Sequence, residues 1–592
     1  MSFFARIRRT PDPADVAEPV TSTQPATSTE PAPAGTPRRW RRIAAVVTTV
    51  VAALLVFAAL VAPNRLSRLT PGGFARLPVE ALAGVAVLVL LPPRVRRVVA
   101  ALAGVLLGLL TILKMLDMGF IETLDRTFDP VLDWPLLGDG LNFVQRTYGV
   151  PGAVVAVAVA VVVAGSLVAL LTGSVLRLTR VAARHRTASL RTAAVLGVAW
   201  IALAATGVTL VPLLPLAANS TAALAYDRAG QIRVGLQDKR AFAAEAAVDA
   251  YRDTPGDQFL TALRGKDVLV TFVESYGRVA VADPEFAPRI TALLAAGTRD
   301  LAAAGFGARS AFLTSPTAGG GSWLAHSTLL SGLWIDNQQR YHNLLASDRL
   351  TLDGAFKRAG WRTVGVQPAV TRAWPEASFY GYDRLLTAQN LGYRGPLFNF
   401  ASMPDQYTLS AFQHDERSVP GHAPIMAEMA LLSSHSPWAP LPRLVDWNAV
   451  GDGTVFDGMP ETGEAPNVDR TRVRDAYRQA VEYSLNTLIS YVLTYGGDNL
   501  VLVFLGDHQP APIVSGEGAP REVPVTIVAH DPAVLARVAG WGWQDGLAPA
   551  PTSPVWRMDT FRDRFLSAFG PPAGPAPAAP VPPSPVPSPS TH

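Results

Sequence analysis

Five stretches of apolar sequence within the first 214 residues are the feature that most constrains the fold of this chain. They lie near 43–62, 77–93, 98–116, 149–172 and 192–214. Because a helix of about 20 apolar residues is needed to cross a hydrocarbon core of about 30 Å, we expect five membrane-spanning helices. The second stretch is the weakest, since Pro78, Glu80 and the Pro92-Pro93 pair shorten it, and a re-entrant or tilted segment is the alternative there.

Arginine placement predicts the orientation of these helices. Arginines gather on one side, before the first stretch, after the second, and between the fourth and fifth, whereas the loop between the third and fourth is rich in acidic residues. The arginine-rich set is Arg38, Arg39, Arg41, Arg42, Arg94, Arg96, Arg97, Arg177, Arg180, Arg184, Arg186 and Arg191. Since positive loops stay in the cytoplasm, we expect a cytoplasmic N-terminus and an extracytoplasmic chain after the fifth helix.

The composition limits the chemistry of the remaining sequence. The 592 residues include no cysteine, so disulfides and thiolate metal sites are excluded, and any metal must be held by carboxylates, imidazoles and hydroxyls. The net charge is only +4, and much of the arginine flanks apolar segments. This pattern favours membrane topology over nucleic-acid binding as the cause of the basic residues, so we expect no nucleic-acid partner.

The chain divides by composition into five parts. Residues 1–40 are predicted to be a disordered cytoplasmic tail and 41–218 a transmembrane domain. The Ala-rich and charged range 219–260 is predicted to be a linker with helical pieces, and 571–592 a disordered Pro-rich tail. The remaining 261–570 is long enough for one large globular domain with its own core.

Short apolar runs alternate with helical patterns in this domain, which indicates an α/β fold. Residues 267–273 and 499–505 are predicted to be buried strands, and the apolar spacing in 472–494 predicts an amphipathic helix before the second of them. Glu274 follows the first strand and Asp507-His508 the second. In parallel sheets, ligands bind beyond the carboxyl ends of the strands, where these residues are expected to lie.

The residue types at this edge predict a metal site with a hydroxyl nucleophile. Two carboxylates and an imidazole suit Mn²⁺, Mg²⁺ or Zn²⁺, and a serine hydroxyl that completes the ligand set would lose its proton more easily. Ser322 follows Gly319-Gly320-Gly321, which permits close approach of the backbone to a phosphate, and 323–330 is expected to begin a helix there. His435 follows a predicted strand at 429–432 and is a candidate to contact a phosphoryl oxygen or to protonate a leaving group.

Each feature taken alone has an ordinary structural explanation. A carboxylate at a strand end is often a helix cap, and glycine-rich loops are usually turns. Other histidines, among them His326, His342, His414 and His422, are expected by default to be exposed or structural. The ordered set is more specific than its parts.

The ordered set resembles the sulfatase and alkaline-phosphatase superfamily, in particular its membrane-anchored lipoteichoic acid synthases and phosphoethanolamine transferases. The matching segments are Val273-Glu274-Ser275, Ser322 with Ser331 nine residues later, Ser434-His435-Ser436-Pro437, and Gly506-Asp507-His508. The resemblance implies five transmembrane helices followed by an extracytoplasmic sulfatase-like α/β domain with a central, mostly parallel sheet. It also implies a divalent metal, Mn²⁺ before Mg²⁺ or Zn²⁺, on Glu274, Ser322, Asp507 and His508.

The departures from the family patterns narrow the expected activity. Ser322 to His326 lacks the Pro and Arg of the sulfatase Cys/Ser-x-Pro-x-Arg motif, which disfavours sulfate-ester hydrolysis. The additional histidine of the phosphoethanolamine transferases is absent near Pro520, so the site is more similar to the single-metal lipoteichoic acid synthases. By that resemblance Arg372 and Trp374, ahead of Gly381-Tyr382-Asp383, are substrate-binding candidates together with His435, and serine replaces the usual threonine nucleophile.

The sequence thus predicts a membrane-bound, metal-dependent transferase. It is expected to move a phospho-alcohol group, such as glycerol phosphate, from a membrane lipid donor to a cell-envelope glycan or lipid acceptor through a phosphoserine at Ser322. One alternative is a hydrolase of the same superfamily that acts outside the membrane on phosphate or sulfate esters. A second alternative is an inactive membrane scaffold.

Overall fold

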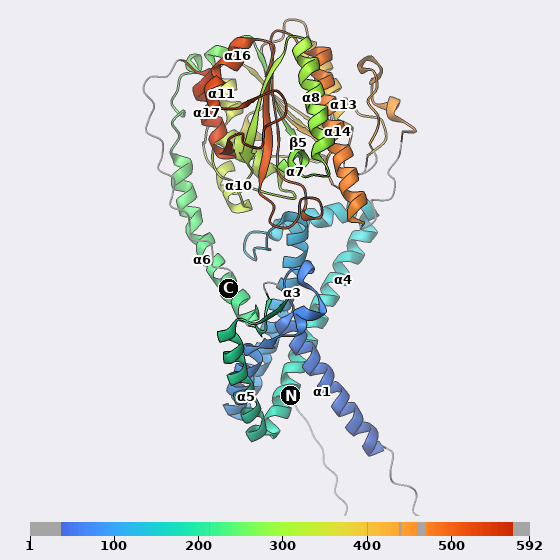
Figure 1. The fold of residues 1–592 in the computed structure, drawn as a ribbon, viewed down its shortest axis with the longest axis vertical. Helices are drawn as coiled ribbons and strands as arrows, with labels where there is room; N and C mark the ends of the chain where they lie inside the picture. The colour runs from blue at the N-terminus through green and yellow to red at the C-terminus, as the bar shows by residue number, and fades with distance from the viewer. Residues whose placement is uncertain are drawn as a thin grey trace, which may run out of the picture.

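The structure is a computed structural model that describes residues 37–211, 214–218, 220–398, 401–436, 438, 441–459 and 469–571. Residues 1–36 of the predicted N-terminal tail and 572–592 of the predicted C-terminal tail lie outside these ranges. In the described chain, a group of long helices lies at one end and a sheet domain at the other (Figure 1).

Six helices precede the sheet domain. They are α1 (Pro37–Val61), α2 (Val79–Leu90), α3 (Pro93–Leu124), α4 (Trp134–Arg184), α5 (Arg186–Thr206) and α6 (Ser220–Ala247), with the short strands β1 (Leu77–Pro78), β2 (Thr209–Val211), β3 (Leu214–Pro215) and β4 (Ala217–Ala218). Among the described residues, four helices are long and apolar enough to cross a membrane, namely Arg39–Val61, Pro93–Leu124, Tyr148–Arg184 and Arg186–Thr206.

The expectation of five full spans is not confirmed, because the second stretch forms only the 12-residue helix α2. At a rise of about 1.5 Å per residue, this helix is about 18 Å long, well short of the hydrocarbon core. Proline explains both of its ends, since Pro78 precedes it and Pro92-Pro93 separate it from α3. The start of α2 lies beside the start of α6, because β1 pairs in parallel with β4.

A buried ion pair joins α3 to α6. The Asp117 carboxylate accepts from Arg228 Nη2 at 2.6 Å, and the two side chains are 0% and 7% exposed. Asp117 also accepts from the Phe128 backbone N–H at 3.0 Å and from Asn64 at 3.2 Å. This one carboxylate therefore connects two helices and two loops beneath the sheet domain.

Removing this carboxylate should destabilise the helical part of the chain. We expect Asp117→Ala to cost about 3–5 kcal/mol, because it leaves the Arg228 guanidinium buried without its partner. The midpoint of thermal unfolding in detergent measures the effect, with Asp227→Ala, at the exposed neighbour of Arg228, as the matched control. Equal midpoints for the two variants would show that the ion pair contributes nothing.

The second half of the chain folds around a nine-stranded sheet of order β12-β6-β11-β10-β5-β9-β7-β8, with β13 also paired to β6. The strands are β5 (Asp267–Val273), β6 (Gly307–Thr314), β7 (Arg362–Gln367), β8 (Arg384–Thr387), β9 (Ile425–Leu431), β10 (Leu500–Gly506), β11 (Glu522–Ala529), β12 (Gln544–Asp545) and β13 (Val555–Arg557). The strands from β10 to β8 run parallel, whereas β11 is antiparallel to both β10 and β6. The domain is therefore a mixed α/β fold with a mostly parallel sheet, as predicted.

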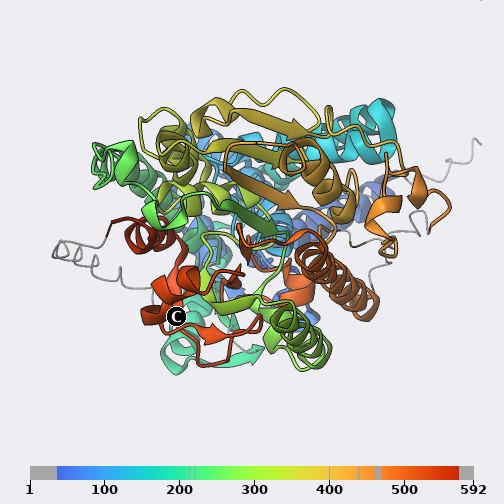
Figure 2. The same ribbon diagram turned by 90° about the horizontal axis from the view of Figure 1, so that it is seen from above.

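Alternate residues of the central strands face opposite layers of helices. From β5, Leu269 and Val273 pack with α8 and α14, whereas Val268 and Val270 pack with α9, α11 and α17. Figure 1 shows α8 and α14 on one side of the strands and α11, α16 and α17 on the other, and Figure 2 gives the view from above. The helices are α7 (Arg278–Ala282), α8 (Ala287–Ala303), α9 (Ser322–Ser331), α10 (Gln338–Leu345), α11 (Leu352–Arg358), α12 (Ala377–Tyr380), α13 (Asp405–Phe412), α14 (Arg470–Tyr495), α15 (Pro512–Ser515), α16 (Pro532–Arg537) and α17 (Phe561–Phe569).

Loops at the end of the helical part contact the sheet domain directly. Arg65 Nη1 lies 2.7 Å from Glu517 Oε2, and the carboxylate of Asp125, just past α3, accepts from the Gly518 backbone N–H at 3.1 Å. The Arg65–Glu517 pair is partly exposed, so it adds little stability. Together these contacts fix the end of α3 against the loop that follows β10.

Candidate functional site

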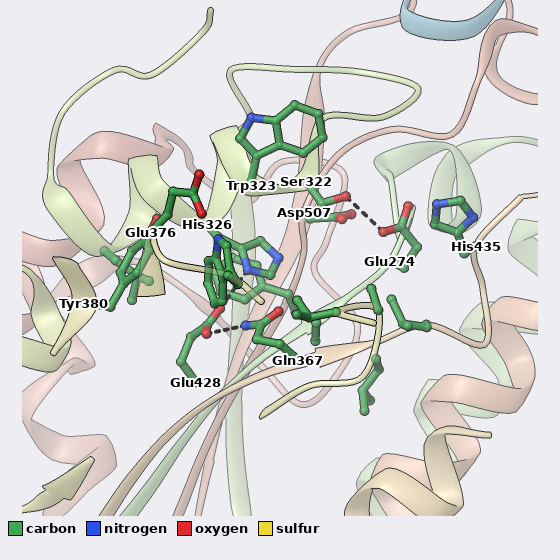
Figure 3. A pocket seen from close by; sticks show the side chains of 18 of the residues that line it. Glu274, Ser322, Trp323, His326, Gln367, Glu376, Tyr380, Glu428, His435 and Asp507 are labelled. Carbon is green, nitrogen blue, oxygen red and sulfur yellow. Dashed lines mark hydrogen bonds and ion pairs between the residues drawn. The ribbon is translucent and has the colours of Figure 1, made fainter. Parts of the chain in front are cut away.

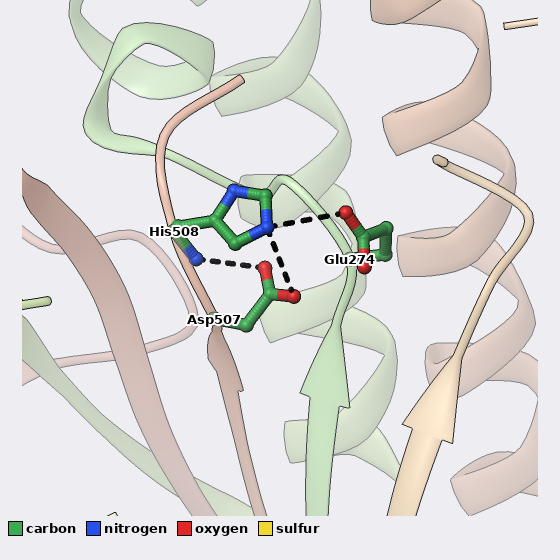
Figure 4. Close-up of side chains that lie close together, drawn as sticks. All are labelled: Glu274, Asp507 and His508. Atoms are coloured by element: carbon green, nitrogen blue, oxygen red, sulfur yellow. Dashed lines mark hydrogen bonds and ion pairs between the residues drawn. The ribbon is translucent and has the colours of Figure 1, made fainter. Parts of the chain in front are cut away.

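The predicted metal ligands meet at the carboxyl edge of the sheet. Strands β5 and β10 pair in parallel with Gly506 opposite Val273, so the residues that follow each strand come together. Candidate ligand atoms of Glu274, Asp507 and His508 all lie within 4.8 Å of one another, and all three residues are buried (Figure 4). The structure therefore brings these three side chains together at one point.

Local hydrogen bonds orient these side chains. Asp507 Oδ1 accepts from the backbone N–H groups of Ser275 at 2.8 Å and His508 at 2.7 Å. His508 Nδ1–H donates to the Gln509 carbonyl at 2.8 Å, so its Nε2 is left to face Glu274 Oε1 at 3.4 Å and Asp507 Oδ2 at 3.5 Å. Metal-binding histidines usually donate the N–H of the nitrogen that does not bind the metal to a carbonyl or carboxylate, as His508 Nδ1 does here.

The charge of the cluster fits a divalent cation. In the part of the chain that the structure describes, neither Glu274 nor Asp507 forms an ion pair with a lysine or arginine. Burial, followed by the negative charge of Glu274, raises the pKa of Asp507 to about 6. Burial lowers the pKa of His508, but the carboxylates of Asp507 and Glu274 outweigh this effect and raise it above its ordinary value. A bound cation would offset the repulsion between the two carboxylates.

These pKa shifts predict a pH dependence of metal binding. Asp507 and His508 must both lose a proton before they can act as ligands, and both hold that proton more tightly than usual. Lowering the pH from about 7 to about 5 should therefore weaken Mn²⁺ binding by at least about tenfold. Calorimetric titration of the metal-free protein at the two pH values checks this, and an affinity that did not change with pH would contradict it.

Ser322 lies within the same cluster. Its Oγ donates to Glu274 Oε2 at 3.0 Å and is 3.2 Å from His508 Nε2. Ser322 is the first residue of α9, and Gly321, in the left-handed conformation with φ of 81°, precedes it. The hydroxyl thus lies between two candidate ligands at a helix N-terminus, where free backbone N–H groups favour an anion.

The glycine loop before Ser322 contacts the end of α3. Gly319, Gly320 and Gly321 all have positive φ, which explains the run of glycine. A Cβ at Gly319 would lie 1.9 Å from the Thr123 carbonyl oxygen, so no side chain fits there. Leu124 and Arg126 line a small cavity together with Gly320 and Gly321. The helical part of the chain therefore packs directly on the loop that carries the candidate nucleophile.

His435 lies on the turn after β9. Its neighbour Ser434 donates through Oγ to the Glu274 carbonyl at 2.6 Å, and Asp405 accepts from two backbone N–H groups of the turn. His435 Nδ1–H donates to the Ser436 carbonyl, and burial lowers the pKa of the ring to about 4. The ring is therefore neutral near pH 7. Pro437, the last residue of the predicted Ser-His-x-Pro segment, lies outside the described residues.

A cavity of about 440 Å³ extends from this cluster between the sheet and α9. Glu274, Ser322, Asp507 and His435 line one part of it, and Glu376, Tyr380 and Glu428 line another (Figure 3). Of the three residues predicted to bind substrate, Trp374 and His435 line the cavity, whereas Arg372 is exposed and is not among the lining residues.

One buried polar group in this cavity is not predicted by the sequence patterns. His326, expected by default to be exposed or structural, is stacked on Phe272 at 3.7 Å and lines the cavity one turn after Ser322. Its Nδ1 lies 2.7 Å from Glu428 Oε1, and Glu428 Oε2 also accepts from Gln367 and Tyr382. Because residues four apart on a helix lie on the same face, the spacing between Ser322 and His326 is the only sequence pattern that could have indicated that His326 faces the cavity.

A comparison of the sequence with protein-family models gives no match. A comparison with curated proteins also gives no match.

Solved structures similar to this chain include lipoteichoic acid synthase, phosphoethanolamine transferases and other alkaline phosphatase superfamily proteins. Lipoteichoic acid synthase LtaP from Listeria monocytogenes is 14% identical over 46% of this chain and 67% of its own, with a TM-score of 0.32. Phosphoglycerol transferase GacH from Streptococcus pyogenes is 12% identical over 56% and 90%, with a TM-score of 0.31. The soluble domain of lipooligosaccharide phosphoethanolamine transferase A from Neisseria meningitidis is 14% identical over 54% and 93%, with a TM-score of 0.35. Similarity at these identities and TM-scores does not indicate a function.

Proposed function

We propose that this protein is a membrane-bound, metal-dependent transferase that moves a phospho-alcohol group, such as glycerol phosphate, from a phospholipid to a cell-envelope glycan or lipid. The observation that supports it most is the position of the Ser322 hydroxyl, 3.0 Å from Glu274 and 3.2 Å from His508, among candidate metal ligands. A nucleophile activated in this way is suited to phosphoryl transfer.

Glu274, Asp507 and His508 would hold the metal, with Ser322 completing the ligand set. Mn²⁺ is the proposed ion, and Mg²⁺ and Zn²⁺ suit the same donors. When bound, the metal lowers the pKa of the serine hydroxyl and offsets negative charge that develops on the phosphoryl oxygens.

In the first half-reaction, Ser322 Oγ, which has already lost its proton to solvent, forms a bond to phosphorus while the bond from phosphorus to the diacylglycerol oxygen breaks. The free N–H groups at the start of α9 stabilise the phosphoryl oxygens. His435 gives a proton to the departing oxygen. Although its pKa is low in the free protein, the negative charge of a bound phosphodiester favours the protonated ring. The products are a phosphoserine that carries the alcohol and free diacylglycerol.

In the second half-reaction, an acceptor hydroxyl attacks the phosphoserine. His435 Nε2 takes the proton of that hydroxyl, because its Nδ1–H is committed to the Ser436 carbonyl. The new bond from phosphorus to the acceptor oxygen forms as the bond to Ser322 breaks. The serine and the protonated histidine are then ready for the next donor lipid.

The domain arrangement supports a lipid donor. We propose that 41–218 is the membrane domain, 219–260 a connection and 261–570 the catalytic domain, with the N-terminus cytoplasmic and the catalytic domain extracytoplasmic. The contact between the end of α3 and the glycine loop keeps the nucleophile next to the membrane helices. A lipid headgroup could therefore reach the site while the acyl chains of the same lipid stay in the bilayer.

Release of diacylglycerol tests this proposal. The purified full-length protein is supplied with labelled phosphatidylglycerol and phosphatidylethanolamine and with Mn²⁺, Mg²⁺ or Zn²⁺. We expect diacylglycerol together with label bound covalently at Ser322, and added acceptor alcohols should carry the label away. Release of the free phospho-alcohol even when acceptors are present would favour the hydrolase, and no release by a protein with bound metal would contradict the lipid-donor reaction.

A further inference from the structure

A second cavity, of about 380 Å³, lies among the helices that precede the sheet domain. Its lining residues run from Glu80 to Val89 on α2, from Ala103 to Leu110 on α3 and from Val175 to Ala182 on α4, and they recur every three or four residues. Residues at that spacing lie on one face of a helix, so each helix contributes one stripe. At a rise of about 1.5 Å per residue, the stripes on α3 and α4 are each about 10 Å long. The cavity is therefore an elongated groove along the helices, called the helix groove below.

The helix groove is apolar, and two of its walls are packed firmly together. Apart from one glutamate and two threonines, its described lining residues are alanine, glycine, valine and leucine. A Cβ at Gly104 would lie 2.6 Å from Thr172 Cα, so α3 and α4 are in close contact. Apolar cavities take up hydrocarbon rather than water. An elongated groove among helices long enough to cross a membrane therefore fits a lipid acyl chain.

One end of the helix groove has a negative charge. Glu80 is the only ionisable group among the described lining residues, and its Oε1 accepts from the backbone N–H groups of Thr221 at 3.1 Å and Ala222 at 2.9 Å. Lys114 also contacts Thr221, but its Nζ donates to the Thr221 hydroxyl and to two carbonyls at the end of α1. Arg76, whose charge also acts on Glu80, does not line the groove. A lipid phosphate at this end would meet a carboxylate and no lining cation, whereas a hydroxyl can donate to a carboxylate.

We propose that the helix groove binds one acyl chain of diacylglycerol, with the free hydroxyl of this lipid at the end that Glu80 lines. Diacylglycerol combines the two features that the groove selects, a linear hydrocarbon chain and an uncharged polar end that donates a hydrogen bond. The site is additional to the proposed catalytic site, although its ligand is the lipid that the proposed transfer would release.

A pair of short-chain lipids tests the charge at the end of the groove. Labelled dioctanoylglycerol is bound to the immobilised full-length protein in detergent. The competitor is dioctanoyl phosphatidate, which has the same acyl chains and a phosphate in place of the hydroxyl. We expect diacylglycerol to bind at least about tenfold more tightly than phosphatidate, because Glu80 opposes the phosphate. Glu80→Gln keeps an oxygen that can accept from Thr221 and Ala222, and it should bind phosphatidate at least about tenfold more tightly than the wild type does.

Filling the groove tests its position. A Cβ at Gly84 has no atom within 4 Å, so α2 tolerates a side chain there, and Gly84 lines the groove. Gly84→Leu should lower the affinity for dioctanoylglycerol by at least about tenfold, because the new side chain occupies the space of the acyl chain. Gly197→Leu is the matched control, since Gly197 on α5 has the same open space but does not line the groove. Ala103→Leu fills the groove from α3 and is an independent second variant.

The outcomes decide between the groove, its ligand and the proposed transfer. Binding that Gly84→Leu and Ala103→Leu both leave unchanged, in protein with the wild-type midpoint of thermal unfolding, would exclude the groove. Equal competition by phosphatidate would show that the groove takes acyl chains of any lipid, and would overturn diacylglycerol as its ligand. Ser322→Ala should bind dioctanoylglycerol like the wild type, because binding needs no turnover, so failure of the proposed transfer would leave these results unchanged.

Discussion

Ser322→Ala should lower the rate of diacylglycerol release by on the order of 10³-fold or more. The variant lacks the hydroxyl that lies 3.0 Å from Glu274 and 3.2 Å from His508, whereas the Ser275 hydroxyl, 2.8 Å from Glu274, forms no hydrogen bond with His508 in the described part of the chain. The measurement is the initial rate with labelled lipid at saturating Mn²⁺.

Ser322→Thr is the matched control for this substitution, since it keeps the hydroxyl and adds one methyl group. We expect it to retain most of the activity and to form the covalent phospho-adduct, which Ser322→Ala cannot form. Ser322→Ala protein that released diacylglycerol at the wild-type rate, with metal bound, would exclude the serine as nucleophile.

Asp507→Ala should abolish stable metal binding and activity together. Asp507 is 1% exposed and lies between His508 and the backbone of Ser275, so its loss removes a proposed ligand and also a group that orients the neighbouring loop. We expect the affinity for Mn²⁺ to fall by at least about 100-fold, which exceeds the loss typical of an outer-shell partner. Metal content after gel filtration, by mass spectrometry, gives the result.

Two controls make this result specific. Asp300→Asn changes an exposed carboxylate far along α8 and should leave the metal content unchanged. Thermal unfolding with and without Mn²⁺ gives a second readout, since only a protein that binds metal in the folded state gains stability from it. Wild-type protein without metal, or Asp507→Ala with full metal content, would contradict the proposed site and favour the inactive scaffold.

The sheet domain was predictable because its central strands are buried on both faces. The run at 267–273 coincides with β5, and the run at 499–505 matches β10 within one residue. Continuous apolar runs of this kind are typical of parallel strands covered by helices on both sides. The helix predicted at 472–494 is contained in α14, because its apolar residues recur at helical spacing.

The membrane part was less predictable, since apolarity alone does not fix the length of a helix. The second stretch is as apolar as its neighbours, but Pro78 and Pro92 limit α2 to 12 residues. The fourth helix extends beyond its apolar region, and the non-helical Gly149 separates its polar first part from the apolar remainder. The backbone conformation at Pro78, Pro92 and Gly149, and not apolarity, decides where α2 ends and where α4 is interrupted.

The candidate site also has a part that the sequence predicts and a part that it does not. The candidate ligands come together because Glu274 and Asp507-His508 directly follow two paired strands, and Ser322 is the first residue of a helix that begins beside them. The far end of the cavity depends on the loop at 370–376, whose path no periodicity encodes. For that reason the sequence predicts Arg372 where Glu376 lines the cavity, and no pattern distinguishes His326 from a structural histidine.

Because a Cβ at Gly319 would lie 1.9 Å from the Thr123 carbonyl oxygen, the loop before Ser322 packs against the end of α3. A fragment that began after α6 would keep the sheet and the three metal ligands but would expose the loop beside Ser322 to water. We expect such a fragment to bind metal like the intact chain and to turn over lipid poorly. If that expectation holds, the helical part and the sheet domain are not interchangeable modules, and a chimera with foreign helices would need its α3 terminus rebuilt as well.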